Sequence, residues 1–178
     1  MALLWGDLAV LKKNLRRWAK DKRKNLDIDN LSTILVKKLK DTKLYISAKN
    51  VMLFYPLQHE VNLLDLMSDN SKNFYLPKIV GKNLACCPYK IGDILSDSCF
   101  KTKEPLTEPV DFSILDLIIV PALAVDKNNY RLGYGGGFYD RLLSTSICST
   151  IVCIPVDLIV ETIYHEEHDV PIDLIITS

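Results

Sequence analysis

The residues with the clearest chemical potential lie in one short segment, RLGYGGGFYDR (residues 131–141). Five consecutive positions of this segment, residues 133–137, hold four of the seven glycines of the chain: Gly133, Gly135, Gly136 and Gly137. Glycine lets the backbone adopt positive φ and approach a ligand closely, and N–H groups turned inward from such a loop can bind phosphate. The spacing matches neither GxGxxG nor GxxxxGK[ST], so a simple tight reversal of the chain is the alternative interpretation.

Two charged side chains flank these glycines. Arg131 precedes them and can offer its planar guanidinium to two phosphate oxygens at once. Asp140 follows them, at the start of a predicted helix, where a carboxylate could hold Mg²⁺ against the same oxygens. An aspartate in a first helical turn can also be purely structural, because it interacts favourably with the helix dipole. Together with the glycines, the two residues indicate a nucleotide-phosphate site.

The elements that must position this loop follow from the hydrophobic pattern. Residues 115–120 (LDLIIV) predict a buried strand before the loop, and residues 138–143 predict a helix after it. Further predicted strands cover residues 51–55, 74–79, 84–89, 150–154 and 174–177, and further predicted helices cover residues 7–24, 29–40, 61–67 and part of the segment between the last two strands. Residues 90–111 predict an irregular connection. Strands that are apolar on both faces and alternate with helices predict an α/β fold, with a mainly parallel sheet that binds ligands beyond its carboxyl edge.

The charges are distributed unevenly, although the formal net charge is zero. Residues 1–43 hold 12 Lys/Arg and 5 Asp, a balance of +7, and the remaining residues balance at −7. In the first predicted helix, Lys12, Arg16 and Arg23 recur on one stripe, where like charges repel one another unless an anion lies between them. The asymmetry fits either an anion-binding arm beside an acidic body or a solvated basic helix face.

Length and composition exclude several classes of protein. A chain of 178 residues with 48% hydrophobic and 25% charged residues is typical of one globular domain, here residues 1–178, and not of collagen, a coiled coil or a disordered tail. Its longest uncharged apolar run, residues 117–125, is far shorter than the ~20 residues of a membrane-spanning helix. The first residues lack the pattern of a signal peptide, and the five cysteines lack metal-ligand spacing. We therefore expect reduced thiols in a cytoplasmic protein.

The segment DLIIVPALAVDKNNYRLGYGGGFYDR (residues 116–141) closely resembles the motif of the 5-formyltetrahydrofolate cyclo-ligase family, whose members are also called 5,10-methenyltetrahydrofolate synthetases. Other parts of the chain resemble family motifs in the same order: KKNLR (residues 12–16), FYPLQHEVN (residues 54–62), the pair Glu104 and Pro105, and EEHDVPIDLIIT (residues 166–177). The resemblance covers essentially the whole chain.

The resemblance implies an ATP- and Mg²⁺-dependent closure of 5-formyltetrahydrofolate to 5,10-methenyltetrahydrofolate, with release of ADP and phosphate. It also implies a three-layer α/β/α single domain related to the ribose-5-phosphate isomerase and CoA-transferase type of fold. We expect a monomer with no nucleic-acid or membrane partner. Chemically, the formamide oxygen is a poor leaving group, and its conversion to a phosphate ester would permit attack by N10.

The matching motifs also imply site residues. Asp140 and Asp169 would hold the metal, and Arg131 would act on the transferred phosphoryl group. Folate would contact Tyr55, Glu60, Tyr134, Gly135, Gly136, Gly137 and Phe138. ATP would contact Lys12, Lys13, Asn14, Leu15, Arg16, Arg131, Leu132, Gly133, Tyr134, Gly135, Gly136, Gly137, Phe138 and Tyr139. For Glu60 taken alone, a solvent-exposed loop position is the alternative to a pterin contact.

The chain departs from the family pattern in places. Val125 stands where an aromatic residue is usual, Phe138 replaces a tyrosine, and Gly136 is a lysine in some relatives. The sequence after Ile151 also diverges. Two other functions are the alternatives. One is a phosphosugar isomerase or CoA-transferase-like enzyme on a related fold, which would not turn over nucleotide. The other is a nucleic-acid-binding module that uses the basic helix and loses affinity steeply with salt.

Overall fold

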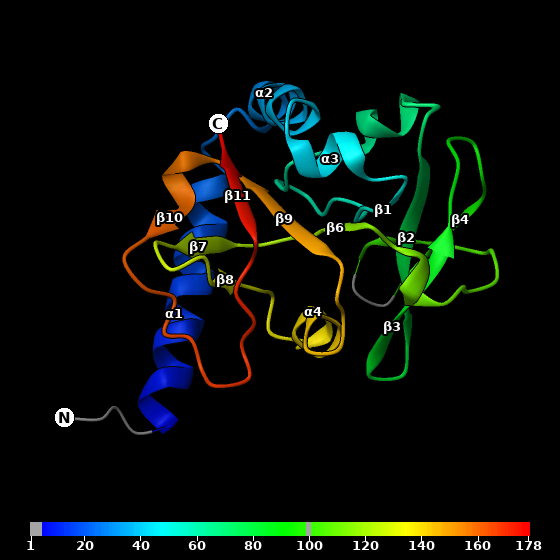
Figure 1. Cartoon of the computed structure of the whole chain (residues 1–178). Helices are drawn as coiled ribbons and strands as arrows, with labels where there is room; N and C mark the ends of the chain where they lie inside the picture. The colour runs from blue at the N-terminus through cyan, green and yellow to red at the C-terminus, as the bar shows by residue number, and fades with distance from the viewer. Residues whose placement is uncertain (1–4, 99–100) are drawn as a thin grey trace.

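The computed structural model describes residues 5–98 and 101–178. At its centre lies a six-stranded sheet in the order β11-β9-β6-β1-β2-β3 (Figure 1). β3 pairs antiparallel with β2, and the other neighbouring strands of this sheet pair parallel, so the predicted mainly parallel sheet is confirmed. The strands are β1 (Asn50–Met52), β2 (Asn73–Val80), β3 (Asn83–Pro88), β6 (Leu117–Ile119), β9 (Ser149–Ile154) and β11 (Leu174–Thr177).

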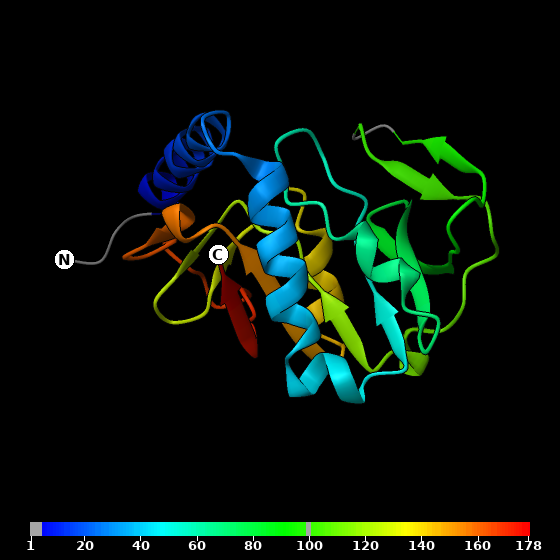
Figure 2. The same ribbon diagram turned by 90° about the horizontal axis from the view of Figure 1, so that it is seen from above.

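Successive residues of the central strands point to opposite faces of the sheet, and both faces are buried. Val51, Leu117 and Ile151 belong to a cluster that includes Leu35 and Leu39 of α2 (Ile28–Lys40). The short helix α3 (Lys43–Ser47) packs into the same cluster and lies beside α2 (Figures 1 and 2). The side chain of Asp27 caps α2 by accepting the N–H of Asn30, as expected of an N-cap aspartate.

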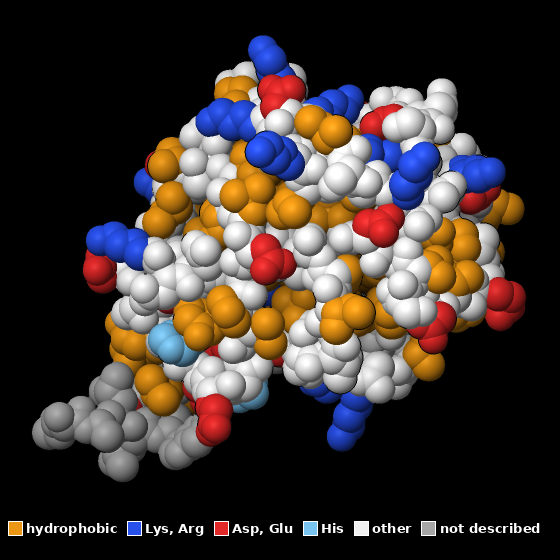
Figure 3. Space-filling view, in the orientation of Figure 1, with side chains coloured by type: hydrophobic (Ala, Val, Ile, Leu, Met, Phe, Trp, Pro, Cys, Tyr) orange, Lys and Arg blue, Asp and Glu red, His pale blue; other side chains and the backbone are white. Residues whose placement is uncertain are grey.

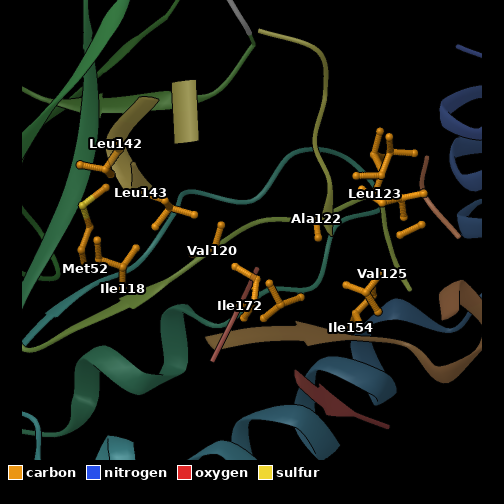
Figure 4. Packing of buried hydrophobic residues seen from close by; sticks show 14 of the residues in the cluster. Met52, Ile118, Val120, Ala122, Leu123, Val125, Leu142, Leu143, Ile154 and Ile172 are labelled. Carbon is orange, nitrogen blue, oxygen red and sulfur yellow. The ribbon is translucent and has the colours of Figure 1, made fainter. Parts of the chain in front are cut away.

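The alternate residues of the same strands form a second cluster on the opposite face. Met52 and Ile118 meet Leu142 and Leu143 of α4 (Phe138–Leu143), and farther along the same cluster Ile154 lies beside Val125, as Figure 4 shows. A small sheet in the order β10-β7-β8 and the long helix α1 (Trp5–Arg23), through Ala19, complete this cluster. Helical segments therefore cover both faces of the central sheet, as the apolar strands predicted. The small sheet consists of β7 (Ala124–Asp126), β8 (Arg131–Leu132) and β10 (Ile159–Val160).

The helix predicted between the last two strands is wrong. After β9 the chain forms one 3₁₀ turn, η3 (Val156–Leu158), then β10, and then a loop without a helix that leads to β11. The chain is held extended here because β10 pairs with β7 and because the N–H of Ile163 donates to the buried carboxylate of Asp126 at 3.2 Å. Tertiary hydrogen bonds thus override a local pattern that was compatible with a helix.

Other element boundaries also differ from the predictions. α1 begins at Trp5, two residues before the predicted start at Asp7, and the predicted helix at residues 61–67 is the 3₁₀ helix η1 (Leu64–Ser68). The predicted irregular connection contains a hairpin of β4 (Leu95–Asp97) and β5 (Lys103–Pro105) and the short η2 (Phe112–Ile114). These three-residue strands are too short to give a periodic signal.

Two expectations from composition can be compared with the described residues. None of the helices they form is both long and apolar enough to cross a bilayer. Cys86, Cys87, Cys148 and Cys153 are free thiols, whereas Cys99 lies outside the described residues. On the face drawn in Figure 3, Lys and Arg side chains gather toward the top, where α2 and α3 lie. Part of the positive excess of residues 1–43 is therefore ordinary solvated charge.

Candidate active site

A cavity of about 390 Å³ opens at the carboxyl ends of β1 and β6. From β1 the chain crosses to β2 on one side, and from β6 it crosses to β9 on the other side. The gap between two such strands is where open α/β sheets bind ligands. The walls come from the loop after β1, the segment after β6, the glycine-rich loop, α1 and the loop before β11. The cavity therefore brings together most of the residues that the sequence singled out.

The glycine-rich loop is positioned by a rigid turn upstream. Asp126, at the end of β7, is buried, and its carboxylate accepts the N–H groups of Asn128 and Tyr130 at 3.0 Å each. The antiparallel pairing of β7 with β8 then delivers Arg131 to the start of the loop. Gly137 adopts a φ of 66° immediately before α4, a conformation that favours glycine.

Arg131 is almost completely enclosed. It is 6% exposed, and its Nη2 atom donates to Oδ1 of Asp140 at 2.7 Å. Burial lowers the pKa of Arg131, although the charge of Asp140 acts in the opposite direction. Among the described residues, Arg131 Nε and the Tyr139 hydroxyl are buried without a hydrogen-bond partner. Both residues line the cavity, so its wall carries polar groups that an oxygen-rich ligand would satisfy.

α1 contributes two more cations to the cavity, Lys12 and Arg16. The Lys12 ammonium is 2.7 Å from Glu166 Oε2 and 2.8 Å from Asp169 Oδ2. Burial alone would lower the pKa of Lys12, but hydrogen bonds to these two carboxylates outweigh it and raise that pKa. Arg16 Nε donates to the carbonyl of Gly133 at 2.9 Å, which ties the helix to the glycine-rich loop.

The other residues of the KKNLR motif do not line this cavity. Lys13 and Asn14 are exposed, and Leu15 packs against the hydrophobic cluster around Ala19. Lys13 belongs instead to a shallow surface hollow of about 440 Å³, lined by Lys13, Arg16, Arg17, Lys20, Asp21 and Lys24. The predicted ATP contacts of Lys13, Asn14 and Leu15 therefore gain no geometric support.

The lining of the cavity also includes a carboxylate, that of Glu60. Glu60 is 5% exposed, so the alternative interpretation of an exposed loop glutamate is wrong. Its Oε1 atom accepts the Tyr134 hydroxyl at 2.8 Å, and its Oε2 atom accepts the N–H of Leu57 at 2.9 Å. Burial raises the pKa of Glu60, and the two hydrogen bonds only partly offset this effect. Tyr55 and Phe138 line the same cavity and add aromatic surface.

The two predicted metal ligands, Asp140 and Asp169, both line the cavity, and each is paired with a cation. Burial tends to raise the pKa of Asp169, but hydrogen bonds from Lys12 and from the N–H of Glu166 outweigh it and lower that pKa. No group of three or more acidic, His or Cys side chains in the described part of the chain is arranged to hold a metal. Mg²⁺ is usually bound by one or two carboxylates together with waters and substrate phosphates, and the pair fits that pattern better than a complete protein cage.

Sequence reasoning assigned no role to several residues that shape the site. Glu166 contacts Lys12, and Glu104 lines the cavity while accepting the N–H of Ile79 at 3.3 Å.

Arg23 is buried; it donates to the carbonyl of Ala122 and lies 3.5 Å from the carbonyl of His59, next to Glu60. The signal for Arg23 was present, because Arg23 shares a stripe with Lys12 and Arg16. For Glu166 the only signal was its position three residues before Asp169.

Comparisons with known proteins identify the family of the chain. The 5-formyltetrahydrofolate cyclo-ligase family matches residues 9–178. The 5-formyltetrahydrofolate cyclo-ligase of Mycoplasma genitalium is 30% identical over 131 residues, which is 73% of each chain, and that of Mycolicibacterium smegmatis is 30% identical over 149 residues, which is 75% of this chain and 76% of the relative. The NMR structure of Aquifex aeolicus 5,10-methenyltetrahydrofolate synthetase is similar with a TM-score of 0.83 and 31% identity, covering 94% of this chain and 89% of that one. The chain therefore belongs to the 5-formyltetrahydrofolate cyclo-ligase family of enzymes.

Proposed function

We propose that the enzyme closes 5-formyltetrahydrofolate to 5,10-methenyltetrahydrofolate by transferring the γ-phosphoryl group of ATP to the formyl oxygen. One observation carries the proposal: a single cavity is lined both by buried cations with unsatisfied donors and by a buried carboxylate with aromatic neighbours. The cations and donors suit a triphosphate, and the carboxylate with its aromatic neighbours suits a reduced pterin.

The triphosphate is assigned to Lys12, Arg16, Arg131 and the glycine-rich loop. Arg131 Nε lacks a partner among the described residues, and a buried donor in that state costs about 1–3 kcal/mol. A phosphate oxygen would remove this cost and add a charge-assisted hydrogen bond. Arg131 is the proposed catalytic residue, because charge on the transferred phosphoryl group is stabilised best by fixed donors in an enclosed site.

The pterin is assigned to the wall around Glu60. A carboxylate only accepts hydrogen bonds, so it suits the N–H groups of a pterin ring. The Tyr134 hydroxyl and the N–H of Leu57 already fix the orientation of Glu60. Tyr55 and Phe138 supply flat apolar surface for the ring.

The proposed reaction balances in two steps. The formyl oxygen attacks the γ-phosphorus and ADP leaves, which makes the formyl carbon electrophilic. N10 then attacks that carbon, loses its proton, and phosphate leaves with the former formyl oxygen. Positioning supplies most of the catalysis, since no protein nucleophile is required. Mg²⁺, when bound by Asp140 and Asp169 together with phosphate oxygens, would neutralise charge on the triphosphate.

The direct test mixes the purified enzyme with Mg²⁺, ATP and 5-formyltetrahydrofolate and follows the near-ultraviolet absorbance of the methenyl product. We expect absorbance to rise only when ATP and Mg²⁺ are both present. Folded protein that yields no product at any substrate concentration would refute the proposal. Product formation without ATP would refute the phosphoryl-transfer route.

Several finer expectations stay predictions. They are the single-domain monomer without a nucleic-acid partner and the relation to the ribose-5-phosphate isomerase and CoA-transferase type of fold. Sedimentation of the purified protein would test the monomer. Weak, strongly salt-dependent retention on single-stranded DNA would be expected of any basic helix, whereas tight retention would count against the absence of a nucleic-acid partner.

A further inference from the structure

We infer that Glu166 is a positioning residue for nucleotide binding, which acts through Lys12. The inference rests on the proposed function, because it gives Lys12 a phosphate to bind. Glu166 is not among the residues predicted to contact ATP, folate or metal. Its carboxylate nevertheless makes the shorter of the two ion pairs of Lys12, at 2.7 Å.

Burial distinguishes this ion pair from an ordinary surface pair. The Lys12 side chain is 10% exposed and that of Glu166 is 19% exposed, whereas the neighbouring Glu167 is exposed to solvent. Surface pairs contribute little because water competes for both charges, but a largely enclosed pair holds its geometry more firmly. The contact spans 154 positions of sequence, so it joins α1 to the loop before β11.

The loop that carries Glu166 is fixed by contacts of its own. The N–H of Glu166 donates to Asp169 Oδ2 at 2.8 Å, and the N–H of Asp169 donates to the carbonyl of Glu166 at 2.9 Å. One residue earlier, the ring of His165 stacks on Tyr130 with centroids 3.9 Å apart, next to Arg131. The Glu166 carboxylate therefore starts from a rigid base that is shared with the glycine-rich loop.

The hydrogen-bonding capacity of Lys12 shows how its ion pair with Glu166 directs the ammonium group. An ammonium group has three N–H donors, and Glu166 and Asp169 each accept one. The third has no partner among the described residues, and Lys12 lines the cavity where the triphosphate is proposed to lie. When Asp169 serves as a metal ligand, Glu166 is the carboxylate that keeps the ammonium directed at the phosphates.

Two accounts of Glu166 predict opposite signs for ATP affinity. A carboxylate that acts only as a negative charge near a triphosphate opposes binding, so its removal would tighten binding. A carboxylate that positions Lys12 favours binding, so its removal weakens it. The dissociation constant of ATP for Glu166→Gln therefore separates the two accounts without any measurement of turnover.

The decisive experiment is a double-mutant cycle on ATP affinity, measured by calorimetry with the full chain. We expect Glu166→Gln to weaken ATP binding about tenfold, which corresponds to about 1.4 kcal/mol. In a Lys12→Gln background the same change should weaken it less than twofold, because the residue it positions is gone. Glu167→Gln is the matched control and should stay within twofold of wild type. Equal effects of Glu166→Gln in both backgrounds, an unchanged affinity, or tighter binding would each overturn the inference.

Two further measurements separate a failure of the role of Glu166 from a failure of the proposed function on which it rests. Steady-state kinetics should show a raised KM for ATP and an unchanged KM for 5-formyltetrahydrofolate, a split that general loss of structure would not produce. If Glu166→Gln does not fold, Glu166→Asp retains the charge but withdraws it from Lys12 and should weaken ATP binding at least threefold; unchanged affinity would overturn the inference. A wild-type enzyme that neither binds ATP nor forms product refutes the proposed function itself, whereas an active enzyme with an additive cycle refutes only the role of Glu166.

Discussion

At the scale of single residues, the lining of the cavity includes a buried cation, Arg131, and a buried carboxylate, Glu60. Each burial is unfavourable in isolation, because a charge loses its hydration. Asp140 compensates Arg131, and two hydrogen-bond donors compensate Glu60. Charges that a fold keeps in this state are typical of sites where a ligand completes the compensation.

Arg131 is the residue whose loss should affect turnover most directly. Arg131→Ala should lower kcat by at least roughly tenfold to a hundredfold, because the transferred phosphoryl group loses a charge-stabilising donor. Arg17→Ala is a suitable control, because Arg17 is exposed on α1 outside the cavity. Steady-state kinetics check the prediction, and equal kcat values for Arg131→Ala and wild type would show that the arginine is structural.

Glu60 should leave a signature in the pH dependence of stability. Its pKa is raised in the folded state, so the folded protein holds the proton more tightly than the unfolded chain. The free energy of unfolding of wild type, relative to Glu60→Gln, should therefore be highest below the ordinary glutamate pKa of 4.5 and decrease as pH rises above it. Denaturant titrations of both proteins check this, and a difference that is constant with pH would contradict the raised pKa. Glu60→Gln should also raise KM for the folate substrate.

At the scale of elements, prediction from sequence succeeded where a segment is long or apolar on both faces. The apolar run LDLIIV predicted β6 correctly, and every residue of that strand is buried. The apolar stripe predicted α2 correctly, and its members Leu35, Val36 and Leu39 are buried. It failed in the segment after β9, where the pairing of β10 with β7 and the bond from Ile163 to Asp126 decide the conformation. Such contacts join residues distant in sequence, so no local pattern reveals them.

In the site, too, some features were predictable from local sequence and others depend on contacts between distant residues. The glycine-rich loop, Arg131 and Glu60 were recognisable as a group of motifs, and the structure places them in one cavity. The enclosure of Lys12 by Glu166 and Asp169, and the support of the Glu60 loop by Arg23, depend on how α1 packs. Residue types predict which groups can do chemistry, whereas tertiary packing decides which of them meet.

A glycine in the loop offers a test at this scale. A Cβ atom at Gly133 would lie 2.7 Å from Nη1 of Arg131, whose side chain is held by Asp140, so Gly133→Ala should displace the arginine. We expect at least a tenfold loss of kcat together with a loss of stability of about 1–3 kcal/mol, because the displaced guanidinium is buried and paired with Asp140. The control is Gly81→Ala, where φ is +61° and nothing lies within 4 Å, so backbone strain should cost about 1–2 kcal/mol without changing kcat. An unchanged kcat with lowered stability for Gly133→Ala would show that Gly133 serves only the turn.

At the scale of the whole molecule, the cavity depends on segments from nearly the full length of the chain. Lys12 comes from the first helix and Asp169 from the loop before the last strand, and each contributes to the other's position. A ligand that binds there links α1 to the central sheet and should stabilise the complete fold.

Ligand binding should accordingly shift the thermal unfolding of the whole molecule. ATP with Mg²⁺ at about 100 times its dissociation constant should stabilise the protein by about 2.7 kcal/mol, which raises Tm by several degrees. Arg131→Ala should lose most of this shift at the same ligand concentration. Calorimetric scans with and without nucleotide check the prediction, and an equal shift in the variant would place the nucleotide elsewhere.

The most direct test of the central claim follows the formyl oxygen. If the cavity transfers a phosphoryl group to that oxygen, a substrate labelled with ¹⁸O in its formyl group should yield inorganic phosphate that carries one labelled oxygen per methenyl product. Mass spectrometry of the released phosphate measures this transfer. Phosphate without label, formed together with the methenyl product, would contradict the proposed coupling of ATP to ring closure.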